Sequence, residues 1–524
     1  MTSLLLISLM LSAIFRPCSL LRNAALYSML GIAFTVLPRR CSLRPLVMIP
    51  AAAPASSKGA APMHSLTRKG RCARCVIPAE ISLARTPPRS AQAPCHAPDI
   101  PPSLAARRVL SPMRSRLNLS AVLALASAVA VRGVSAAAPI LGQYWPAYKS
   151  ATQSVSQVPW SYSSKNGIAY YFGPLALGPS DMSAKAFVTE AKAHGVRPVF
   201  SVGGWSGSIY FSDLVATAAE RITFARQLKA FMDKYGFVGV DLDWEYPNGE
   251  GLGCNKRRPD DSTNLLAFLK VLRAEIGRDK LITAAVPASG FRGPDGKALR
   301  SFAAFANEMD YINLMTYDMS GSWSATTGPH SPLRKCRSDS SAWTAVKLWT
   351  SRGFPASKIL LGIPSYAISF TTRESKLATV SIDNGRWQSK AYQAWTGVVP
   401  QGAAGDSNVG SSVTDPCGVT TCAVYSGQWQ YRELVSNGLL DRTGRSGANG
   451  YVRYWDACTA VPFLFNPSKK HYISYEDSKS AGMKAEWAAK QGLAGVFLFD
   501  STGFDATVYD AITAGLYSRK ARRA

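Results

Sequence analysis

The sequence has little histidine and no histidine pattern that would bind a metal. Only five of its 524 residues are histidine, and the three after residue 136, namely His194, His330 and His471, lie far apart. Cys72 and Cys75 form a lone CxxC with no second pair nearby, whereas a structural zinc site needs about four ligands. We therefore expect neither a metal nor another cofactor.

A long run of Lys and Arg is also missing from most of the chain. The whole chain carries 59 Lys and Arg against 33 Asp and Glu, a formal net charge of +26. Residues 1–136 contain 17 of these basic residues and two of the acidic ones, so more than half of the excess charge lies in a quarter of the chain. The remaining sequence is only mildly basic, which argues against nucleic acid as a partner.

The first apolar run, residues 4–15, is shorter than the roughly 20 residues that a membrane-spanning helix needs. A more complete signal begins at Met113. Residues 113–116 are basic, 117–131 are apolar and 134–136 are small, which are the three parts of a secretory signal peptide in order. We predict a signal peptide at 113–136 and a disordered or spurious upstream extension at 1–112. A genuine basic leader that targets or anchors the protein is the alternative.

Secretion would give an extracellular protein without stable membrane insertion, which we expect to be a monomer. It would also permit disulfides. The predicted mature chain has five cysteines, an odd number, so at least one stays unpaired or pairs between chains. We expect Cys254 to pair with Cys336, because both follow predicted strands that end at the same rim. The Asn-x-Ser sequon at Asn118 lies inside the signal, so no N-glycan site is expected in the mature protein.

After residue 139 short apolar runs alternate with amphipathic helical stretches such as 217–234 and 262–276. Near-continuous apolar strands that alternate with helices are typical of parallel βα units. Eight such units predict an α/β fold, the (β/α)8 TIM barrel, with its active site at the carboxyl ends of the strands. The candidate strands are 140–144, 167–172, 198–202, 238–244, 281–287, 311–317, 358–364 and 493–499.

The interval between the starts of the last two candidate strands is 135 residues, too long for one crossover. A helix predicted at 476–491 accounts for its end. We predict that residues 366–474 form a small α+β insertion domain between strand 7 and helix 7, and that 137–365 and 475–524 form the barrel. The alternative is a long irregular loop, which is uncommon at this length.

Three carboxylates, Asp241, Asp243 and Glu245, are spaced by two along the candidate strand 238–244 and the residue that follows it. Because side chains of a strand alternate between its faces, all three should project from one face, with Leu242 and Trp244 on the other. Like charges and loss of solvent should raise the pKa of at least one of them, leaving a group that can donate a proton near neutral pH. An exposed acidic edge strand is the alternative, but the apolar stretch before it argues against this.

At this point the sequence resembles a known family. The run from Phe237 to Pro247 is similar to the DGxDxDxE signature of glycoside hydrolase family 18, the chitinases. Ser201-Val-Gly-Gly204 resembles the family's SxGG, and Met315-Thr-Tyr317-Asp318 its MxYD. Further similar stretches follow in the same order, at 281–289, 361–366, 455–463 and 473–477. The insertion lies where the deep-cleft subgroup carries its chitinase insertion domain.

The resemblance implies roles for the acidic residues and for one tyrosine. Glu245 would be the general acid. Asp243 would hydrogen-bond Glu245 and then the acetamido N–H of the substrate, and Asp241 would lie deeper and tune Asp243. Tyr317 would donate to the acetamido oxygen, and Asp318 would bind the distorted sugar. The substrate's own N-acetyl carbonyl would be the nucleophile, an exception to the two-carboxylate scheme.

Other residues would contact the sugar or support the site. The resemblance assigns Ser201 to the aspartate network and Met315 and Phe499 to the substrate site, and aromatic rings at Tyr144 and Trp205 should stack on sugar. Trp145 and Trp323 could either contact sugar or pack in the protein, and we expect Tyr366 to be a packing residue. In three places the sequence departs from the family, with Val238 for an Asp, Ile368 for an Arg and Phe499 for a Trp.

The resemblance therefore predicts a secreted, endochitinase-like enzyme that cleaves β-1,4 bonds between N-acetylglucosamine units of chitin and chito-oligosaccharides. Two alternatives remain, a chitin-binding lectin-like protein on the same barrel and an endo-β-N-acetylglucosaminidase that acts on N-glycans. The lectin reading is weakened by Glu245, because such proteins usually lose this residue. Endo or exo action is left open.

Overall fold

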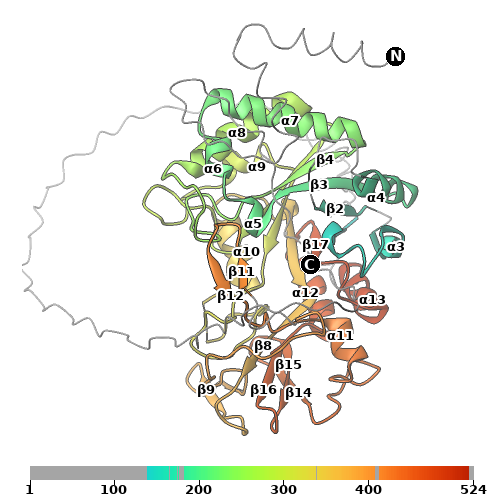
Figure 1. Cartoon of the computed structure of the whole chain (residues 1–524), viewed down its shortest axis with the longest axis vertical. Helices are drawn as coiled ribbons and strands as arrows, with labels where there is room; N and C mark the ends of the chain where they lie inside the picture. Colours follow the sequence, from blue (N-terminus) through green and yellow to red (C-terminus); the bar gives the residue numbers. More distant parts are fainter. Residues whose placement is uncertain are drawn as a thin grey trace, which may run out of the picture. The chain divides into compact units, whose positions relative to one another are not determined.

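The computed structural model describes residues 138–163, 166–173, 175, 182–337, 339–406 and 412–518. The predicted signal peptide and the upstream extension lie outside these residues. Among the described residues, eight parallel strands close into a barrel in the order β1-β17-β7-β6-β5-β4-β3-β2 (Figure 1). The barrel strands are β1 Ile140–Pro146, β2 Ile168–Phe172, β3 Arg197–Gly203, β4 Gly239–Asp243, β5 Leu281–Pro287, β6 Tyr311–Met315, β7 Ile359–Pro364 and β17 Gly495–Phe499. Each overlaps one of the eight candidate strands, and the predicted TIM barrel is confirmed.

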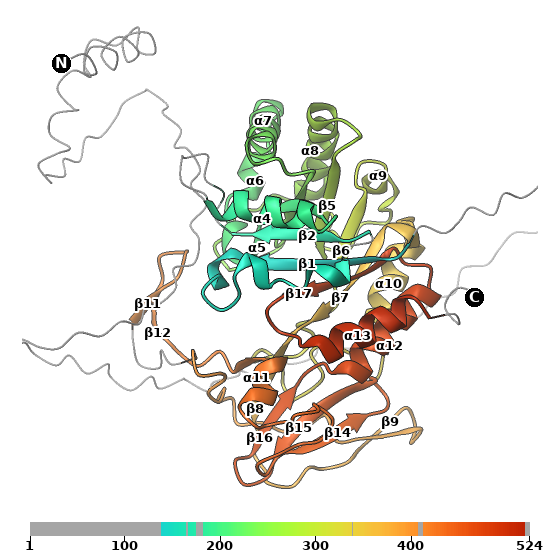
Figure 2. The same cartoon turned by 90° about the vertical axis from the view of Figure 1, so that its right-hand side faces the viewer.

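Helices follow the strands and cover the outside of the barrel. In chain order they are α3 Trp160–Ser163, α4 Met182–Ala193, α5 Gly204–Gly207, α6 Phe211–Leu214, α7 Ala218–Tyr235, α8 Asp261–Ile276, α9 Ala303–Ala306, α10 Ala342–Ser351, α12 Ser478–Lys490 and α13 Ala506–Leu516. Figure 2 shows α7 beside α8, and α12 beside α13, on the outside of the barrel. One face of the barrel strands thus packs against helices, and the other faces the barrel interior.

Local sequence explains where the long helix α7 begins and ends. Thr217 caps its first turn by accepting a hydrogen bond from the backbone N–H of Glu220, whose side chain bonds back to Thr217. This reciprocal arrangement satisfies two N–H groups that the helix cannot pair internally. Gly236 then ends the helix with φ 78°, a left-handed conformation that favours glycine. The helix leads directly into β4, which carries the acidic side chains.

The strand alternation divides the apolar residues of the barrel into two clusters. Val240 and Leu242 of β4 point outward into the large core between barrel and helices. A smaller cluster fills the barrel interior and includes Tyr144, Tyr170 and Phe497. Asp241 lies on the inner face with this second cluster, fully buried. The acidic face of β4 therefore points into the barrel, as the spacing of two predicts.

The segment between β7 and α12 forms a second sheet. Its five antiparallel strands follow the order β13-β8-β16-β15-β14. They are β8 Tyr366–Thr371, β13 Gln428–Gln430, β14 Val452–Asp456, β15 Val461–Asn466 and β16 His471–Ser474, with helix α11 Tyr431–Ser436. Two hairpins precede β13, formed by β9 Val380–Ile382 with β10 Trp387–Ser389 and by β11 Ser412–Thr414 with β12 Thr420–Cys422. The predicted α+β insertion after strand 7 is present, with its own apolar cluster.

Two disulfides join the loops of the barrel rim to the insertion, and the expected pairing of Cys254 with Cys336 is wrong. Cys254 pairs with Cys417 and Cys336 with Cys458, at Cα–Cα distances of 5.7 and 5.8 Å. Cys422 belongs to neither disulfide. Both rim cysteines do follow barrel strands, but the insertion brings its own cysteines within bonding distance of each. Strand order alone cannot reveal that approach.

We expect peptide mapping without reductant to link Cys254 with Cys417 and Cys336 with Cys458. Replacing Cys336 and Cys458 together by alanine should lower the free energy of unfolding by about 2–5 kcal/mol, because the unfolded chain gains freedom. Denaturant unfolding measures this. The control Cys422→Ala should change the same free energy by less than about 1 kcal/mol. Peptides that join Cys254 to Cys336 would contradict the assignment.

Candidate active site

A cavity of about 940 Å³ opens at the carboxyl ends of the barrel strands. Residues from β1, β3, β4, β5, β6 and the loops that follow them line it. Those predicted from the sequence and found in its lining are Tyr144, Ser201, Trp205, Asp243, Glu245, Met315, Tyr317, Asp318 and Phe499. Asp241 is not among the lining residues. It lies deeper, fully buried, as the resemblance implies.

Asp241 accepts hydrogen bonds from four side chains. The donors are Tyr144 Oη at 2.7 Å and Ser201 Oγ at 2.8 Å on one oxygen, and Thr283 Oγ1 at 2.6 Å and Asn313 Nδ2 at 3.2 Å on the other. Burial raises the pKa of Asp241, and these hydrogen bonds oppose that rise because they favour the charged form. The predicted support by Ser201 is a direct hydrogen bond.

Thr283 and Asn313 were missed by reasoning from the sequence. They lie on β5 and β6, where each interrupts an otherwise apolar strand. Register alignment places Thr283 directly beside Asp241 on the neighbouring strand. A polar residue inside an apolar barrel strand was therefore the available signal, but only the strand register identifies its partner.

Asp243 lines the cavity, and its surroundings disfavour the charged form of its carboxyl group. Burial raises its pKa well above the ordinary value, and the neighbouring charges of Glu245 and Asp241 raise it further. Its Oδ1 atom is buried and has no hydrogen-bond partner in the described part of the chain. The expected hydrogen bond from Asp243 to Glu245 is thus absent at this oxygen. Asp243 is a lining residue of the cavity, although this oxygen is itself buried.

Glu245 follows β4 and lies at the cavity wall. Burial raises its pKa to about 7, with a small further increase from the charge of Asp318. A hydrogen bond with the side chain of Tyr246 opposes the rise. The sequence-based expectation that at least one of the three carboxyls has a raised pKa is confirmed. The Glu245 carboxyl is mainly protonated below pH 7 and mainly charged above it.

The opposite wall comes from β6 and the loop after it. Tyr317 stacks on Phe499, with ring centroids 6.0 Å apart and an interplanar angle of 25°. Asp318 is half exposed and accepts a hydrogen bond of 2.6 Å from Tyr366 Oη. Burial raises the pKa of Tyr317 well above the ordinary value, so the phenol keeps its proton. Tyr317 can therefore act as a hydrogen-bond donor in the cavity.

Tyr366 corrects an expectation of the sequence analysis. It packs in the apolar cluster of the insertion, as predicted for a packing residue, but it also lines the cavity and holds Asp318. Its position as the first residue of β8, directly where the chain leaves the barrel, gives it both roles. The sequence places it after the seventh strand but gives no sign of its contact with Asp318.

The three tryptophans considered as sugar contacts differ in their exposure and surroundings. Trp205 is 49% exposed and lines the cavity, whereas Trp145 is 1% exposed and stacks on Phe187 in the core. Trp323 is 66% exposed and is not among the lining residues. Trp145 is thus a core residue, and of these three rings only that of Trp205 is presented to the cavity.

The three departures from the family signature have different surroundings. Ile368 is buried in β8 within the apolar cluster of the insertion. Phe499 lies at the end of β17, between the rings of Tyr317 and Tyr144. Val238 immediately precedes β4, and its backbone bonds to Pro198 and Leu281. Apolar contacts thus accommodate Ile368 and Phe499.

Within the ranges that the structure describes, no three His, Cys, Asp or Glu side chains are grouped to hold a metal ion. In that same part of the chain, no helix has the length and hydrophobicity needed to cross a bilayer.

A parallel barrel with a cavity at its carboxyl end and buried carboxyls in the cavity wall is compatible with a glycoside hydrolase, although this fold also carries other enzymes. Comparison with family models identifies which one. The model described as "Glycosyl hydrolases family 18" matches residues 144–503, and the chain belongs to that family.

Individual relatives agree with this assignment. A chitinase-like effector of Moniliophthora roreri is 33% identical over 396 residues, which covers 73% of this chain and 94% of the relative. Chitinase A1 of Niallia circulans is 32% identical over 325 residues, or 59% of this chain and 40% of the relative. Among solved structures, a chitinase of Rhizomucor miehei superposes with a TM-score of 0.62 at 27% identity, covering 72% of this chain and 99% of that one.

The raised pKa of Glu245 can be measured without substrate. In protein labelled with carbon-13 at the glutamate side-chain carboxyls, one resonance should titrate with a midpoint near pH 7, because burial disfavours the charged form. The variant Glu245→Gln should lack that resonance, which assigns it. A Glu245 midpoint near the ordinary value of about 4.3 would show that the carboxyl is solvated.

Proposed function

We propose that this protein is a chitinase that hydrolyses β-1,4 bonds between N-acetylglucosamine units by substrate-assisted, retaining catalysis. The observation that carries the proposal is the placement of Glu245, Asp243 and Tyr317 around one cavity at the carboxyl end of the barrel. A proton donor, an acceptor for an amide N–H and a donor for an amide oxygen are the groups that an acetamido nucleophile requires.

Glu245 is proposed as the general acid. A general acid works best when its pKa is close to the working pH, and the raised pKa of about 7 meets this condition. It would protonate the glycosidic oxygen as the bond to the anomeric carbon breaks. Since the acid must be protonated to act, kcat/KM should fall as the pH rises through about 7.

The substrate's acetamido group would form the new bond to the anomeric carbon. In our proposal the carboxyl group of Asp243, which lines the cavity, accepts the acetamido N–H, and Tyr317 donates to the carbonyl oxygen. Asp241 lies beneath them, held by its four donors, and its charge contributes to the raised pKa of Asp243. Water then attacks the anomeric carbon and releases the acetamido group, with Glu245 now accepting a proton. Two inversions at one carbon give overall retention.

The remaining lining residues are proposed to hold the sugars. Apolar faces of sugar rings stack on aromatic side chains, and Tyr144, Trp205 and Phe499 line the cavity. Asp318 would bind the distorted sugar next to the bond that breaks. Chitin and chito-oligosaccharides are the proposed partners.

We further propose that the protein is secreted, with a signal peptide at 113–136. The two disulfides are compatible with an oxidising compartment. The division into a barrel, 137–365 and 475–524, and an insertion domain, 366–474, is part of the same proposal.

Replacing Glu245 by glutamine keeps the shape of the side chain but removes its transferable proton. We expect kcat on a chitin hexamer to fall by about 10²–10⁴-fold, the usual contribution of general acid catalysis. Binding of the hexamer, measured by calorimetry, should be retained, which also serves as the control for folding. An unchanged kcat would exclude Glu245 as the acid.

The nucleophile can be identified from the product and from the substrate requirement. Proton NMR of early product from chitin oligomers should show the β anomer first, because two inversions restore the configuration. Fully deacetylated oligomers lack the internal nucleophile and should not be cleaved. An initial α anomer would mean that water attacks directly, and cleavage of deacetylated oligomers would mean that the acetamido group is not the nucleophile.

One comparison favours a second candidate function. The relative from Moniliophthora roreri, nearly all of which this chain covers, bears the name chitinase-like effector. The alternative is therefore a protein that binds chitin fragments without turnover. Release of reducing ends from chitin oligomers by the wild type would exclude it, and hexamer binding without product would support it. A zymogram with glycol chitin beside a glycoprotein separates chitinase activity from action on N-glycans.

A further inference from the structure

Asp318, the second residue after Thr316, has an unusual backbone conformation at the cavity. Asp318 has φ 57°, in the left-handed region that residues other than glycine rarely adopt. Such a conformation persists only where the surroundings enforce it. Tyr317 and Asp318 both line the cavity, so whatever holds this dipeptide also sets the position of both side chains.

Hydrogen bonds from one segment hold the dipeptide on both sides. Before it, Ser331 Oγ donates to the carbonyl oxygen of Thr316 at 2.8 Å. After it, the backbone N–H of Met319 donates to the carbonyl oxygen of His330 at 2.8 Å. The side chain of Thr316 is itself tied to β7 through Gly362 O at 2.7 Å. The placement of the dipeptide therefore depends on the placement of residues 330 and 331.

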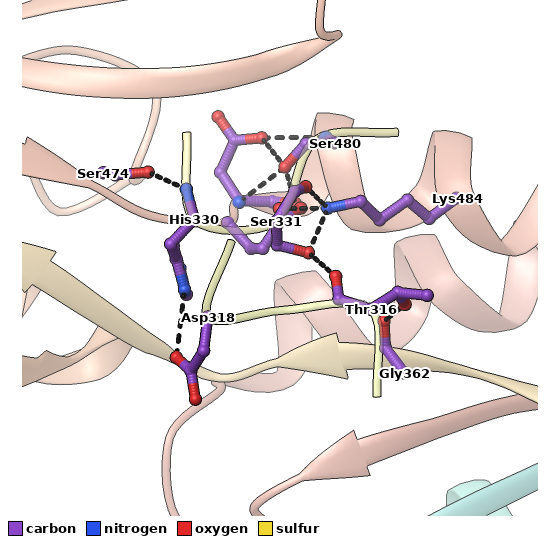
Figure 3. A network of polar contacts seen from close by, with 10 residues as sticks. Thr316, Asp318, His330, Ser331, Gly362, Ser474, Ser480 and Lys484 are labelled. Atoms are coloured by element: carbon purple, nitrogen blue, oxygen red, sulfur yellow. Dashed lines mark hydrogen bonds and ion pairs between the residues drawn. The ribbon is translucent and has the colours of Figure 1, made fainter. Parts of the chain in front are cut away.

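Residues 330 and 331 are in turn held by the insertion sheet and by α12. The backbone N–H of His330 donates to Ser474 Oγ at 3.0 Å. Lys484 Nζ donates to the carbonyl oxygen of Ser331 at 2.5 Å and to its Oγ at 3.0 Å (Figure 3). The ammonium also forms an ion pair with Glu476, and both side chains are at most 1% exposed. A continuous set of contacts thus runs from α12 to the wall of the cavity.

This ion pair is poorly explained by stability alone. Removing two charges from water is expensive, and a buried pair is often no more stabilising than apolar side chains of similar volume. Ordinary helix packing would need no lysine at this position. The ammonium does supply two donors to a single serine, which an apolar side chain could not.

We propose that Lys484, paired with Glu476 and acting through Ser331, is a positioning residue that fixes Tyr317 and Asp318 for catalysis. The inference rests on the proposed hydrolase function. Lys484 lies outside the cavity lining and touches no substrate. Its effect reaches the site through the carbonyl oxygen of Thr316.

The mildest test removes the Ser331 hydroxyl, which donates to the carbonyl oxygen of Thr316 and accepts from Lys484 Nζ. Ser331→Ala deletes the donor to Thr316, and Ser501→Ala is the matched control, because both serines are 1% exposed and each side chain donates one hydrogen bond of 2.8 Å. Small displacements of reacting groups are costly in rate, so kcat on a chitin hexamer should fall roughly tenfold in Ser331→Ala, with little change in KM. Ser501→Ala should keep the wild-type kcat. Equal values for the two variants would overturn the proposal.

A double-mutant cycle tests whether Ser331 acts through the dipeptide. In an Asp318→Asn background the same Ser331→Ala change should lower kcat by less than about threefold, because residues that act together are not additive. An undiminished tenfold loss in that background would mean that Ser331 acts elsewhere and would overturn the inference.

The ion pair itself is tested by a variant that leaves no unpaired charge. Lys484→Met alone would bury an isolated Glu476, so Lys484→Met/Glu476→Leu is preferred, since such replacements often preserve stability. We expect this folded double variant to lose at least as much kcat as Ser331→Ala. A double variant with wild-type kcat would show that the pair is only structural. If the double variant does not fold, the positioning role is decided by Ser331→Ala and its double-mutant cycle.

Failure of the proposed function is distinguishable from failure of this inference. If the wild type releases no product, the hydrolase proposal fails, and the same cycle is measured on hexamer binding by calorimetry. Ser331→Ala should then weaken binding in the wild type and not in the Asp318→Asn background. Equal weakening in both would overturn the positioning role.

Discussion

The structure depends on three neighbouring carboxyl groups, those of Asp241 and Asp243 on the inner face of β4 and that of Glu245 two residues after the strand ends. Charge is disfavoured there, because burial removes these groups from water. The protein accommodates Asp241 with four hydrogen-bond donors from β1, β3, β5 and β6. Glu245, with fewer compensating contacts, has a pKa raised to about 7. One constraint thus gives two carboxyl groups four residues apart very different hydrogen-bonding surroundings.

The same constraint explains why the barrel interior is polar at one level and apolar at another. Tyr144 stacks on Tyr170 within the inner apolar cluster, yet its hydroxyl donates to Asp241. Asn313 both donates to Asp241 and accepts a hydrogen bond from Tyr170. Each aromatic ring therefore fills space while its polar end supports the acidic network. Closing the barrel is what brings these residues from opposite strands together.

The insertion is coupled to the catalytic face rather than only appended to it. Two disulfides connect it to rim loops, and its first strand supplies Tyr366 to Asp318. The segment 330–331 is held by Ser474 of β16 and by Lys484 of α12. A change in the insertion can therefore alter the cavity without touching a residue that contacts substrate. Two departures from the family pattern, Ile368 and Phe499, both pack in or against the apolar cluster of the insertion.

The sequence by itself determined the barrel, because apolar strand runs alternating with amphipathic helices admit few other arrangements. It also determined the acidic face of β4, because side chains spaced by two share a face whatever the surroundings. The disulfide partners, the four donors to Asp241, the second role of Tyr366 and the contacts of Lys484 were decided by tertiary structure alone. Each depends on an approach between segments tens to hundreds of residues apart. Local periodicity carries no information about such distances, and only barrel closure and the docking of the insertion fix them.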